Sequence, residues 1–233
     1  MMIDIHSHVL PGIDDGSGSV EESLAMLRAS ACQGIDCIAA TPHFYPMEDT
    51  PEKFLTRREE AAERLRSAWR PGLPKLLLGA EVYFFEGMSR VEALDMFCLE
   101  GSRVLLVEMP FGPWPEWAVS EVVSLRERRG LTVVLAHIER YFRWQPKGIW
   151  DELPDMGILT QCNAGFFLDW KTRGKARRMF KQGKISFLGS DAHNMTSRPP
   201  RLGDAMTFLG RTGRSTLEEN ISQVFSDMGE MVR

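Results

Sequence analysis

Two histidines separated by one residue follow a short apolar run at the N-terminus of this 233-residue chain. On an extended strand, residues i and i+2 point to the same side, so His6 and His8 could both face one ion. Asp15 comes seven residues after His8, in a segment rich in proline, glycine and aspartate that must turn. Imidazoles with a nearby carboxylate suit a borderline metal ion. The pair alone is equally consistent with a metal site and with two ordinary polar residues, so the rest of the sequence must distinguish these two interpretations.

The other candidate ligands share one position with this pair, at or just after the carboxyl end of a predicted strand. None of the five histidines falls in a predicted helix or in the C-terminal tail. In α/β barrels this end of the strands carries the active site, whereas histidines without a common role would be scattered. The pattern predicts nine metal ligands, which are His6, His8, Asp15, His43, Glu81, Glu108, His137, Asp191 and His193.

Nine ligands exceed the needs of one ion, because a tetrahedral zinc site uses only about four. We therefore expect two or three ions, some of them bridged by a carboxylate. Closely spaced ions orient an oxyanion substrate and make a bound water acidic enough to attack near neutral pH. A set of nitrogen and oxygen ligands without thiolate admits manganese, iron, zinc or cobalt, and the residue types do not choose among them.

Arginines close to the ligands would bind an anionic substrate. Arg140 lies three residues after His137, and Arg198 lies five residues after His193. A guanidinium binds phosphate oxygens through two parallel hydrogen bonds, so we expect both arginines to hold a phosphate. The alternative for any arginine is a solvated surface charge. That alternative fits four others better, namely Arg57, Arg58, Arg128 and Arg129.

Strands and helices alternate along the whole chain. Apolar runs predict seven strands, the first in the N-terminal run and the others at 35–41, 76–80, 104–107, 133–136, 158–162 and 185–188. Caps, helical spacing and glycine stops predict helices at 19–34, 51–69, 89–98, 116–129, 171–182, 204–210 and 215–228. Parallel strands need such crossovers. We therefore expect an α/β protein in which residues 1–233 form a single closed or nearly closed β/α barrel.

Composition excludes several classes of function. The net charge of -4 gives no basic surface for nucleic acid. No apolar run approaches the ~18 residues needed to cross a membrane, and the first residues do not have the pattern of a signal peptide. The four cysteines form no Cys-x-x-Cys pair and suggest buried thiols in a reducing compartment. We expect a cytoplasmic protein without membrane insertion, and the sequence leaves open whether it forms an oligomer.

An ordered set of motifs between residue 3 and about residue 200 resembles the polymerase-and-histidinol-phosphatase (PHP) superfamily. The branch that it resembles most is that of the manganese-dependent protein-tyrosine phosphatases of bacterial capsule and exopolysaccharide loci. The motifs are His6-x-His8 with Pro11–Gly16, Ala40-Thr41-Pro42-His43, Gly79-Ala80-Glu81, Val107–Phe111, Ala136–Tyr141 and Ser190–Asn194.

The resemblance implies a distorted (β/α)7 barrel of the PHP type that holds three metal ions, manganese above the other candidates. It implies one ion on His6, His8, Glu81 and Asp191, a second on Glu81, Glu108 and His137, and a third on Asp15, His43 and His193. It also implies that Arg140 and Arg198 contact the phosphate. Ile138 departs from the family pattern, which usually has proline there, and this affects the shape of the loop rather than the ligands.

The function that these features favour is hydrolysis of phosphotyrosine in a protein, with a bacterial tyrosine autokinase as the expected substrate. A cysteine-based phosphatase is disfavoured, because no cysteine has an arginine six residues later, as a Cys-x5-Arg phosphate loop requires. One alternative is a phosphomonoesterase for a small molecule such as histidinol phosphate. The other is a non-catalytic, metal-bound regulatory partner of a kinase, although such a protein would gain little from nine ligands and two arginines.

Overall fold

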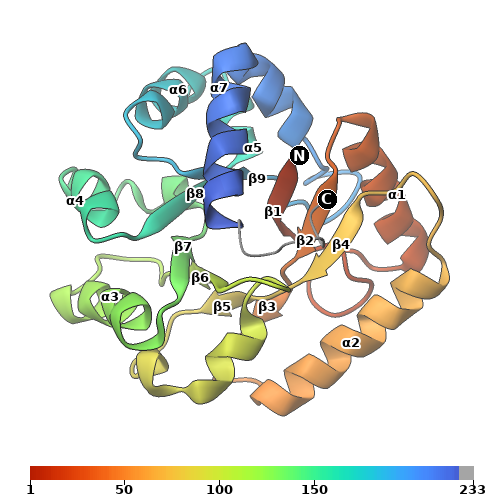
Figure 1. The fold of residues 1–233 in the computed structure, drawn as a ribbon, viewed down its shortest axis with the longest axis horizontal. Coiled ribbons are helices and arrows are strands. Elements are labelled where there is room, and N and C mark those ends of the chain that lie inside the picture. Colours follow the sequence, from red (N-terminus) through yellow and green to blue (C-terminus); the bar gives the residue numbers. More distant parts are fainter. Residues whose placement is uncertain (226–233) are drawn as a thin grey trace.

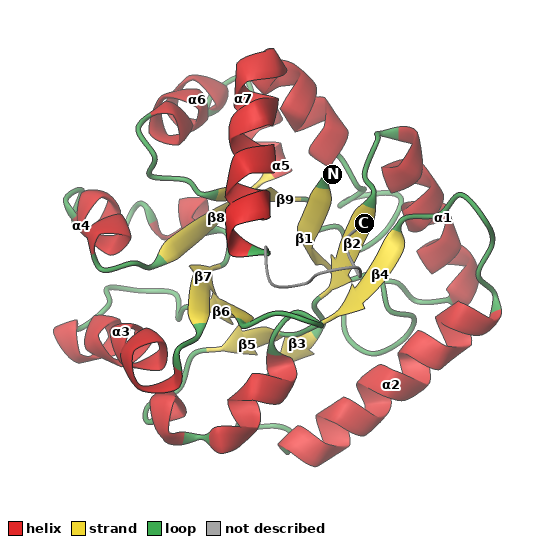
Figure 2. Cartoon of the chain, in the orientation of Figure 1, coloured by secondary structure: helices red, strands yellow, loops and turns green. Residues whose placement is uncertain are grey.

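Parallel strands surround the centre of the molecule, and helices cover their outer side (Figures 1 and 2). The computed structural model describes residues 1–225. The strands are β1 (Ile3–Ser7), β2 (Cys37–Ala40), β3 (His43–Phe44), β4 (Lys75–Leu78), β5 (Glu81–Tyr83), β6 (Val104–Glu108), β7 (Thr132–Leu135), β8 (Leu159–Asn163) and β9 (Phe187–Gly189). Every pair of neighbouring strands in this part of the chain is parallel, which confirms the predicted α/β class with crossover helices.

Two of the predicted strands are each interrupted by a short break. The order is β1-β2-β4 in one sheet and β3-β5-β6-β7-β8-β9 in the other, so β2 continues into β3 and β4 into β5. Pro42 has no N–H to give to a ladder, and it lies at the first break. Gly79 lies at the second, where a Cβ would come within 2.4 Å of the Leu99 side chain. The backbone of Glu81 donates to Pro42 O at 3.0 Å and so keeps the two broken strands together.

The segment after β9 returns to the first strand. The backbone N–H of His8 donates to the carbonyl of Ala192 at 2.8 Å, and that of Asp191 donates to the carbonyl of His6 at 2.9 Å. The sheet is therefore curled, and its first and last strands meet. This contact brings the N-terminal and C-terminal motifs of the sequence to one place.

The helices lie on the outer side of the curled sheet. They are α1 (Val20–Cys32), α2 (Pro51–Ser67), α3 (Glu116–Arg129), α4 (Ile149–Asp155), α5 (Ala164–Leu168), α6 (Arg173–Lys181) and α7 (Leu202–Val224), with 3₁₀ turns at η1 (Met88–Arg90), η2 (Glu92–Phe97) and η3 (Ile138–Tyr141). The predicted caps are present, because the Ser19 side chain accepts from Glu22 N and Thr50 from Lys53 N. Each of these residues caps the first turn of an amphipathic helix that packs on the sheet.

The predicted helices differ from the observed helices in three ways. Residues 89–98 form two 3₁₀ turns rather than an α-helix, and the i, i+3 spacing of the buried Leu94 and Phe97 suits that tighter turn. The short helices α4 and α5 were not predicted. The predicted helices 204–210 and 215–228 are joined in α7 across Gly210, whose φ of 73° interrupts the helical conformation. Residues 226–228 of the last prediction lie outside the described residues.

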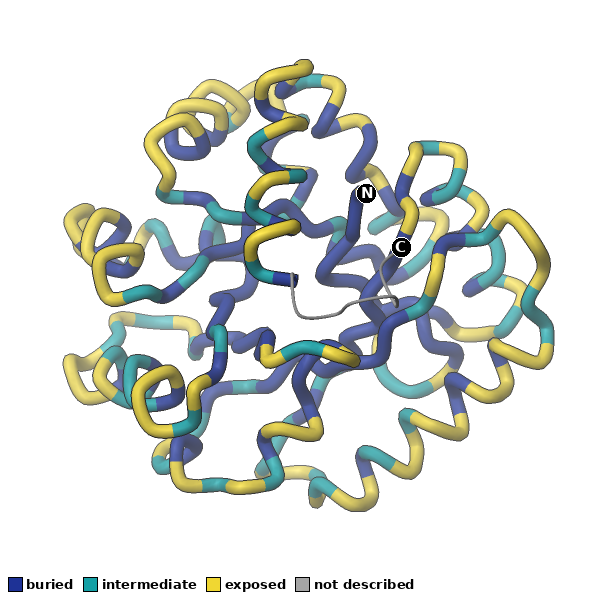
Figure 3. The backbone as a smooth tube through the Cα atoms, viewed as in Figure 1, coloured by how far each residue is buried: buried dark blue, intermediate teal, exposed yellow. Residues whose placement is uncertain are grey.

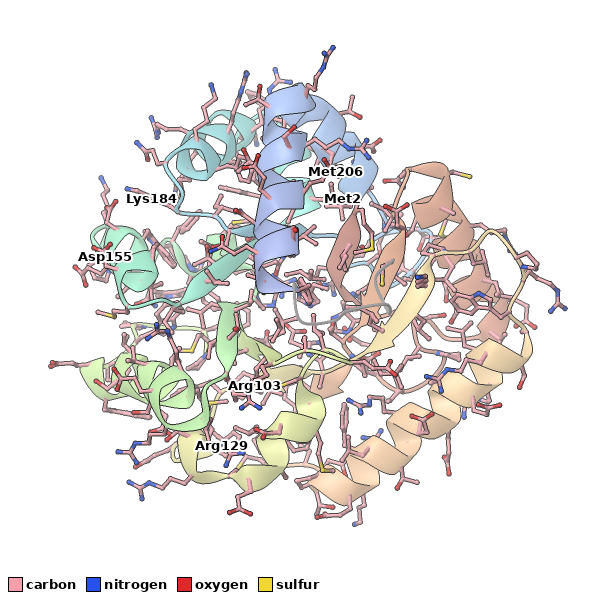
Figure 4. All side chains as sticks on the ribbon, viewed as in Figure 1. Met2, Arg103, Arg129, Asp155, Lys184 and Met206 are labelled. Atoms are coloured by element: carbon pink, nitrogen blue, oxygen red, sulfur yellow. The ribbon has the colours of Figure 1, made fainter. Side chains whose placement is uncertain are left out.

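The buried residues follow the strands and the inner turns of the helices, and the exposed residues lie on the outer turns of the helices (Figure 3). Arg129 and Lys184 lie on the periphery of the molecule (Figure 4). They form ion pairs that link neighbouring elements, Arg129 with Asp95 at 2.8 Å and Lys184 with Asp151 at 2.6 Å. Exposed pairs of this kind contribute about 0–1 kcal/mol each, so the apolar core dominates the stability. Within residues 1–225, no helix has the length and apolar character needed to span a membrane.

Candidate metal centre

The strand ends bring all nine predicted ligands to one end of the curled sheet. His6, Glu81 and Glu108 lie in β1, β5 and β6, and His43 lies in β3. The other predicted ligands are in the loops that follow β1, β7 and β9, namely His8, Asp15, His137, Asp191 and His193. Eight of the nine side chains are buried or nearly so, and the exception is Asp15, whose side chain is 64% exposed.

Glu81 is the central residue of the cluster. Its Oε2 lies 3.2 Å from Nε2 of His6, 3.3 Å from Nε2 of His8 and 3.1 Å from Nδ1 of His43. Its Oε1 lies 2.7 Å from Nε2 of His137. Burial alone would raise the pKa of Glu81, but the charges of His6 and His137 hold it well below its usual range. This carboxylate faces four imidazoles and can bridge two ions.

Asp191 divides its two oxygens between two sides of the cluster. Oδ1 lies 3.6 Å from Nε2 of His6 and 3.5 Å from Nε2 of His8. Oδ2 accepts from Arg140 and from the side-chain amide of Asn163 at 2.6 Å, and it forms an ion pair with Arg198 at 2.7 Å. One oxygen therefore faces the imidazoles, and the other faces both predicted phosphate-binding arginines.

Three overlapping groups of side chains have the spacing to hold an ion. They are His6 with His8 and Glu81; His43 with Glu81 and Glu108; and His8 with Asp15, His43 and His193. The first and third contain most of two groups implied by the family resemblance. His137 lies 2.7 Å from Glu81 and 3.6 Å from Glu108, so it adjoins the second.

Several buried atoms of the cluster have no hydrogen-bond partner. They are Nδ1 of His43, Oε2 of Glu81 and Nε2 of His193. Buried polar atoms are nearly always satisfied, so three unsatisfied ones that converge at one place require an explanation. Each is a nitrogen or oxygen atom that can donate a lone pair to a cation. The residues present therefore fit the metal ions that the ligand types imply.

Asp14 belongs to the site and was missed in the sequence. Its Oδ2 lies 2.8 Å from Nδ1 of His8 and accepts from the backbone N–H of His43 at 3.0 Å. Burial would raise the pKa of Asp14, but the hydrogen bond and charge of His8 lower it to about 2. A carboxylate on Nδ1 leaves Nε2 of His8 to face the cluster. The feature of the sequence that could have indicated Asp14 was its position next to Asp15 in the same turn.

Gly16 allows this turn to fold back against the histidine. A Cβ at Gly16 would lie 2.3 Å from the carbonyl oxygen of His8, closer than any side chain could tolerate. The backbone N–H of Gly16 donates to Oδ1 of Asp14 at 2.9 Å. The Gly/Asp-rich segment after β1 is therefore part of the support for the cluster rather than a simple connection.

Three further side chains that the sequence did not indicate contact the ligands. The hydroxyl of Tyr141 lies 3.3 Å from Nδ1 of His137. The other two are the amides of β8, Gln161 and Asn163, which contact His6, His137 and Asp191. Glutamine, asparagine and tyrosine are common in strands and loops, so their types gave no signal.

An open cavity of about 570 Å³ borders the cluster on the side of His43. Asp14, Asp15, His43 and Tyr45 form one part of its wall, and Lys53 and Arg57 from α2 form another. The ring of Tyr45 stacks on that of His43 with centroids 5.1 Å apart. Arg57, expected on a solvated helix face, thus reaches the cavity, where it pairs with Asp49 and donates to Ile13 O.

A curled parallel sheet with imidazoles, carboxylates and arginines at one end has the features of a metal-dependent hydrolase that acts on an anionic substrate. Comparison with known proteins gives the family. The chain belongs to the CpsB/CapC family of capsular polysaccharide synthesis, whose model matches residues 2–230.

Curated relatives in this family are named tyrosine-protein phosphatases. CpsB of Streptococcus pneumoniae is 33% identical over 233 residues, which cover 90% of each chain. CpsB of Streptococcus agalactiae serotype V is 31% identical over 231 residues, also 90% of each chain. YwqE of Bacillus subtilis is 30% identical over 224 residues, which cover 93% of this chain and 87% of YwqE.

The fold agrees with a solved structure. A chain from the crystal structures of Bacillus subtilis YwqE and Streptococcus pneumoniae CpsB, described as metal-dependent tyrosine phosphatases, matches with a TM-score of 0.82 at 26% identity. The match covers 97% of this chain and 95% of that one. The resemblance to capsule-locus tyrosine phosphatases predicted from the sequence motifs is confirmed.

Proposed function

We propose that this protein is a metal-dependent tyrosine-protein phosphatase whose substrate is a bacterial tyrosine autokinase of capsule or exopolysaccharide synthesis. The observation that carries the proposal is the convergence of nine ligand-type side chains and two arginines at one end of the sheet. The names of the relatives support the reaction, and the family's part in capsular polysaccharide synthesis supports the choice of partner.

The residues that would hold two or three ions are His6, His8, Asp15, His43, Glu81, Glu108, His137, Asp191 and His193, with Glu81 shared. Bound ions would neutralise phosphate charge and lower the pKa of a water molecule. Manganese suits this mixed nitrogen and oxygen set and is the metal that we propose.

Arg140 and Arg198 would hold the phosphate group of the substrate. Their side chains are 31% and 35% exposed, and both reach the same oxygen of Asp191. Each guanidinium has five N–H donors, so one contact with Asp191 leaves others for a phosphate. Asp191 thereby orients the two arginines on the open side of the cluster. Their positive charges would stabilise the charge that gathers on the transferring group.

The aromatic ring of phosphotyrosine would lie in the cavity beside the cluster. Tyr45 offers a ring face there, stacked on the ring of His43. The leaving phenolate has a conjugate acid of pKa about 10, so it departs more readily than an alkoxide.

The same proposal extends to the architecture and the compartment. We assign residues 1–233 to one domain, a distorted (β/α)7 barrel of the PHP type in which β2 with β3 and β4 with β5 count as single strands. The four cysteines are free, and three of them are buried, which suits the reducing cytoplasm.

The test is hydrolysis of a phosphotyrosine peptide by protein purified without chelator, with metal content measured by elemental analysis. We expect two or three bound ions and a preference for phosphotyrosine over a phosphoserine peptide and histidinol phosphate. Glu81→Gln should lose both metal and activity, whereas Glu127→Gln, which changes an exposed residue of α3, should lose neither. Preferential hydrolysis of histidinol phosphate would replace the proposal with a small-molecule phosphatase, and metal binding without any hydrolysis would leave a regulatory protein.

A further inference from the structure

Strand β8 differs from its neighbours at the ligand-bearing end of the sheet. Each of the other strands, with β2–β3 and β4–β5 taken together, supplies a predicted ligand from its carboxyl end or the following loop. β8 lies between β7 and β9 and supplies none (Figure 1). It places two amides there instead, Gln161 and Asn163, whose i, i+2 spacing puts them on the same face of the strand.

The side-chain oxygen of Gln161 joins two predicted ligands. Oε1 accepts from the backbone N–H of His137 at 2.8 Å and lies 3.1 Å from Nδ1 of His6. A backbone N–H can only donate, so the atom of Gln161 that faces it must be the oxygen. Nδ1 of His6 must then carry a proton and donate to Oε1. Because Nδ1 carries the proton, Nε2 of His6 is the ring nitrogen that faces the cluster, 3.2 Å from Glu81.

The network continues from Gln161 to a third ligand. Nε2 of Gln161 donates to Oδ1 of Asn163 at 2.9 Å, and Nδ2 of Asn163 donates to Oδ2 of Asp191 at 2.6 Å. A carboxylate accepts, so the donor and acceptor roles agree at both ends of the network. One continuous set of hydrogen bonds therefore connects His6 and His137 with Asp191 through the two amides of β8.

Two of these ligands have a backbone conformation that L-residues rarely adopt. His137 has a φ of 31° and Asp191 a φ of 50°, and these are the two non-glycine residues with positive φ in the described chain. Such conformations persist only where the surroundings hold them in place. Gln161 holds the backbone N–H of His137, and Asn163 holds the side chain of Asp191.

Gly189 of β9 leaves the space that Gln161 occupies. A Cβ at Gly189 would lie 2.9 Å from Nε2 of Gln161 and 2.8 Å from Cβ of His6. The side chain of Gln161 therefore fits closely between β9 and the first ligand. The amide has little freedom to turn, which makes it an effective support.

We propose that Gln161 and Asn163 are positioning residues that set the tautomer of His6 and hold His137 and Asp191 in place for metal binding. The inference rests on the metal-dependent function proposed above. Groups that orient metal ligands in this way typically contribute 10- to 100-fold, so we expect loss of the Gln161 acceptor to weaken metal binding by about 10–100-fold.

The test compares two nearly isosteric replacements at one position. Gln161→Met removes both the acceptor and the donor of the amide. Gln161→Glu keeps an acceptor for the His6 ring and the His137 backbone and loses only the N–H that donates to Asn163. Mn²⁺ affinity of protein freed of metal, measured from the signal of free Mn²⁺ in electron paramagnetic resonance, should fall about 10–100-fold in the Met variant and be largely restored in the Glu variant. A role in packing alone predicts the opposite order, because methionine fills the space and a buried carboxylate costs solvation.

Thr160→Val is the matched control on the same strand. Thr160 is buried and donates its hydroxyl to the carbonyl of Lys184 at 2.8 Å, on the face away from the cluster. This variant should lower the melting temperature and leave Mn²⁺ affinity unchanged. If Gln161→Met does not fold, Asn163→Leu at the half-buried end of β8 tests the same network and should also weaken Mn²⁺ binding.

A second measurement does not depend on affinity. In Zn²⁺-loaded protein labelled with ¹⁵N-histidine, the Nδ1–H proton of His6 should exchange slowly in the wild type and in Gln161→Glu, and rapidly in Gln161→Met. If Gln161→Met kept the Mn²⁺ affinity of the wild type and the slow exchange of the His6 proton, this inference would be overturned and the proposed function would stand. A larger loss of Mn²⁺ affinity in the Glu variant than in the Met variant, in step with stability, would assign Gln161 to packing. A wild-type protein that binds no Mn²⁺ would overturn both this inference and the proposed function.

Discussion

The candidate metal centre has a buried half and an open half, and the two are constructed differently. In the buried half, the side chains of His6, His8, His137 and Glu81 are no more than 1% exposed. The second nitrogen of each ring already has a partner, which is Gln161 for His6, Asp14 for His8 and Tyr141 for His137. These contacts are made by protein groups, and they orient the three imidazoles from the side away from the cluster.

The open half contains the groups that meet solvent. His43 is 13% exposed and Asp15 64%, and both line the cavity. Arg140 and Arg198, which contact Asp191, are 31% and 35% exposed. Arg198 and Asp15 lie 3.9 Å apart and carry opposite charges, so an electrostatic attraction rather than close packing links them. Under the proposed function, the buried half would fix the geometry of the ions and the open half would admit the substrate. Changes in the two halves should therefore have different effects on metal content and turnover.

Removal of the metal should have the largest effect, because it abolishes what both halves contribute. Ions supply several kcal/mol of charge stabilisation, and each 1.36 kcal/mol is a factor of ten, so chelation should lower hydrolysis of a phosphotyrosine peptide by about 10³-fold or more. Added Mn²⁺ should restore the rate. A chelated protein, shown by elemental analysis to hold no metal, that still works at full rate would contradict the metal-dependent reaction.

Removal of either arginine should affect turnover without loss of metal. Each guanidinium contacts a phosphate that gathers charge in the transition state, so Arg140→Ala or Arg198→Ala should cost about 10²–10³ in turnover, as loss of one oxyanion donor does. Lysine should not restore the rate, because it lacks the bidentate geometry. The measurements are kcat, metal content and melting temperature.

The exposed Arg128 of α3 provides the control for this prediction, since it lies on the outer face of a helix. Arg128→Ala should behave as the wild type. Near-wild-type turnover in all three variants would remove the arginines from phosphate binding. A loss of turnover that followed a loss of metal would instead give Arg140 and Arg198 the role of holding Asp191, which both contact.

A change at Asp14 should show the opposite behaviour to the arginines. Asp14→Ala removes the carboxylate that orients His8, so Mn²⁺ affinity should fall about 10–100-fold. Turnover at saturating Mn²⁺ should change much less than in the arginine variants. Titration of activity against Mn²⁺ measures both quantities. If Asp14→Ala lowered saturated turnover while its Mn²⁺ affinity stayed at the wild-type value, the division between the two halves would be wrong.

The sequence indicated which candidate ligands would lie together more clearly than it indicated the side chains that contact them. Histidines and carboxylates at strand ends are rare enough to be noticed together, and the structure brings all nine to one cluster. Asp14, Gln161 and Asn163 have types and positions that are ordinary for a turn or strand. Gln161 and His6 are 155 residues apart, so their contact exists only once β8 and β1 lie in the same curled sheet.

The fold shows the same division between periodic and local signals. Long apolar or amphipathic segments such as β6 and α3 were predicted closely, because their spacing repeats over several residues. The breaks at Pro42 and Gly79 were not, since β3 and β5 add only two and three residues. Helix α4 contains Pro154, which argued against a helix there. Short elements depend on their tertiary neighbours, which one sequence does not reveal.

The cysteines should have the smallest effect on catalysis, because they belong to neither half of the centre. Burial raises the pKa of the Cys37 and Cys98 thiols to about 12, so neither is a thiolate near neutral pH. Substitution of Cys37, Cys98, Cys162 or the exposed Cys32 by Ala or Ser should leave turnover within a few-fold. Mass spectrometry of the folded protein after iodoacetamide treatment near pH 8 should show modification at Cys32 alone.

The buried thiols of Cys37 and Cys98 also make the stability of the fold depend on pH, because the unfolded chain loses their protons above a pKa of about 9 and the folded chain keeps them. Stability should therefore decline as the pH rises above about 9, by about 1.4 kcal/mol per pH unit for each such thiol, and Cys37→Ala should reduce that slope. Loss of activity in a well-folded cysteine variant that keeps its metal would return a thiolate nucleophile to consideration and place it outside both halves of the centre.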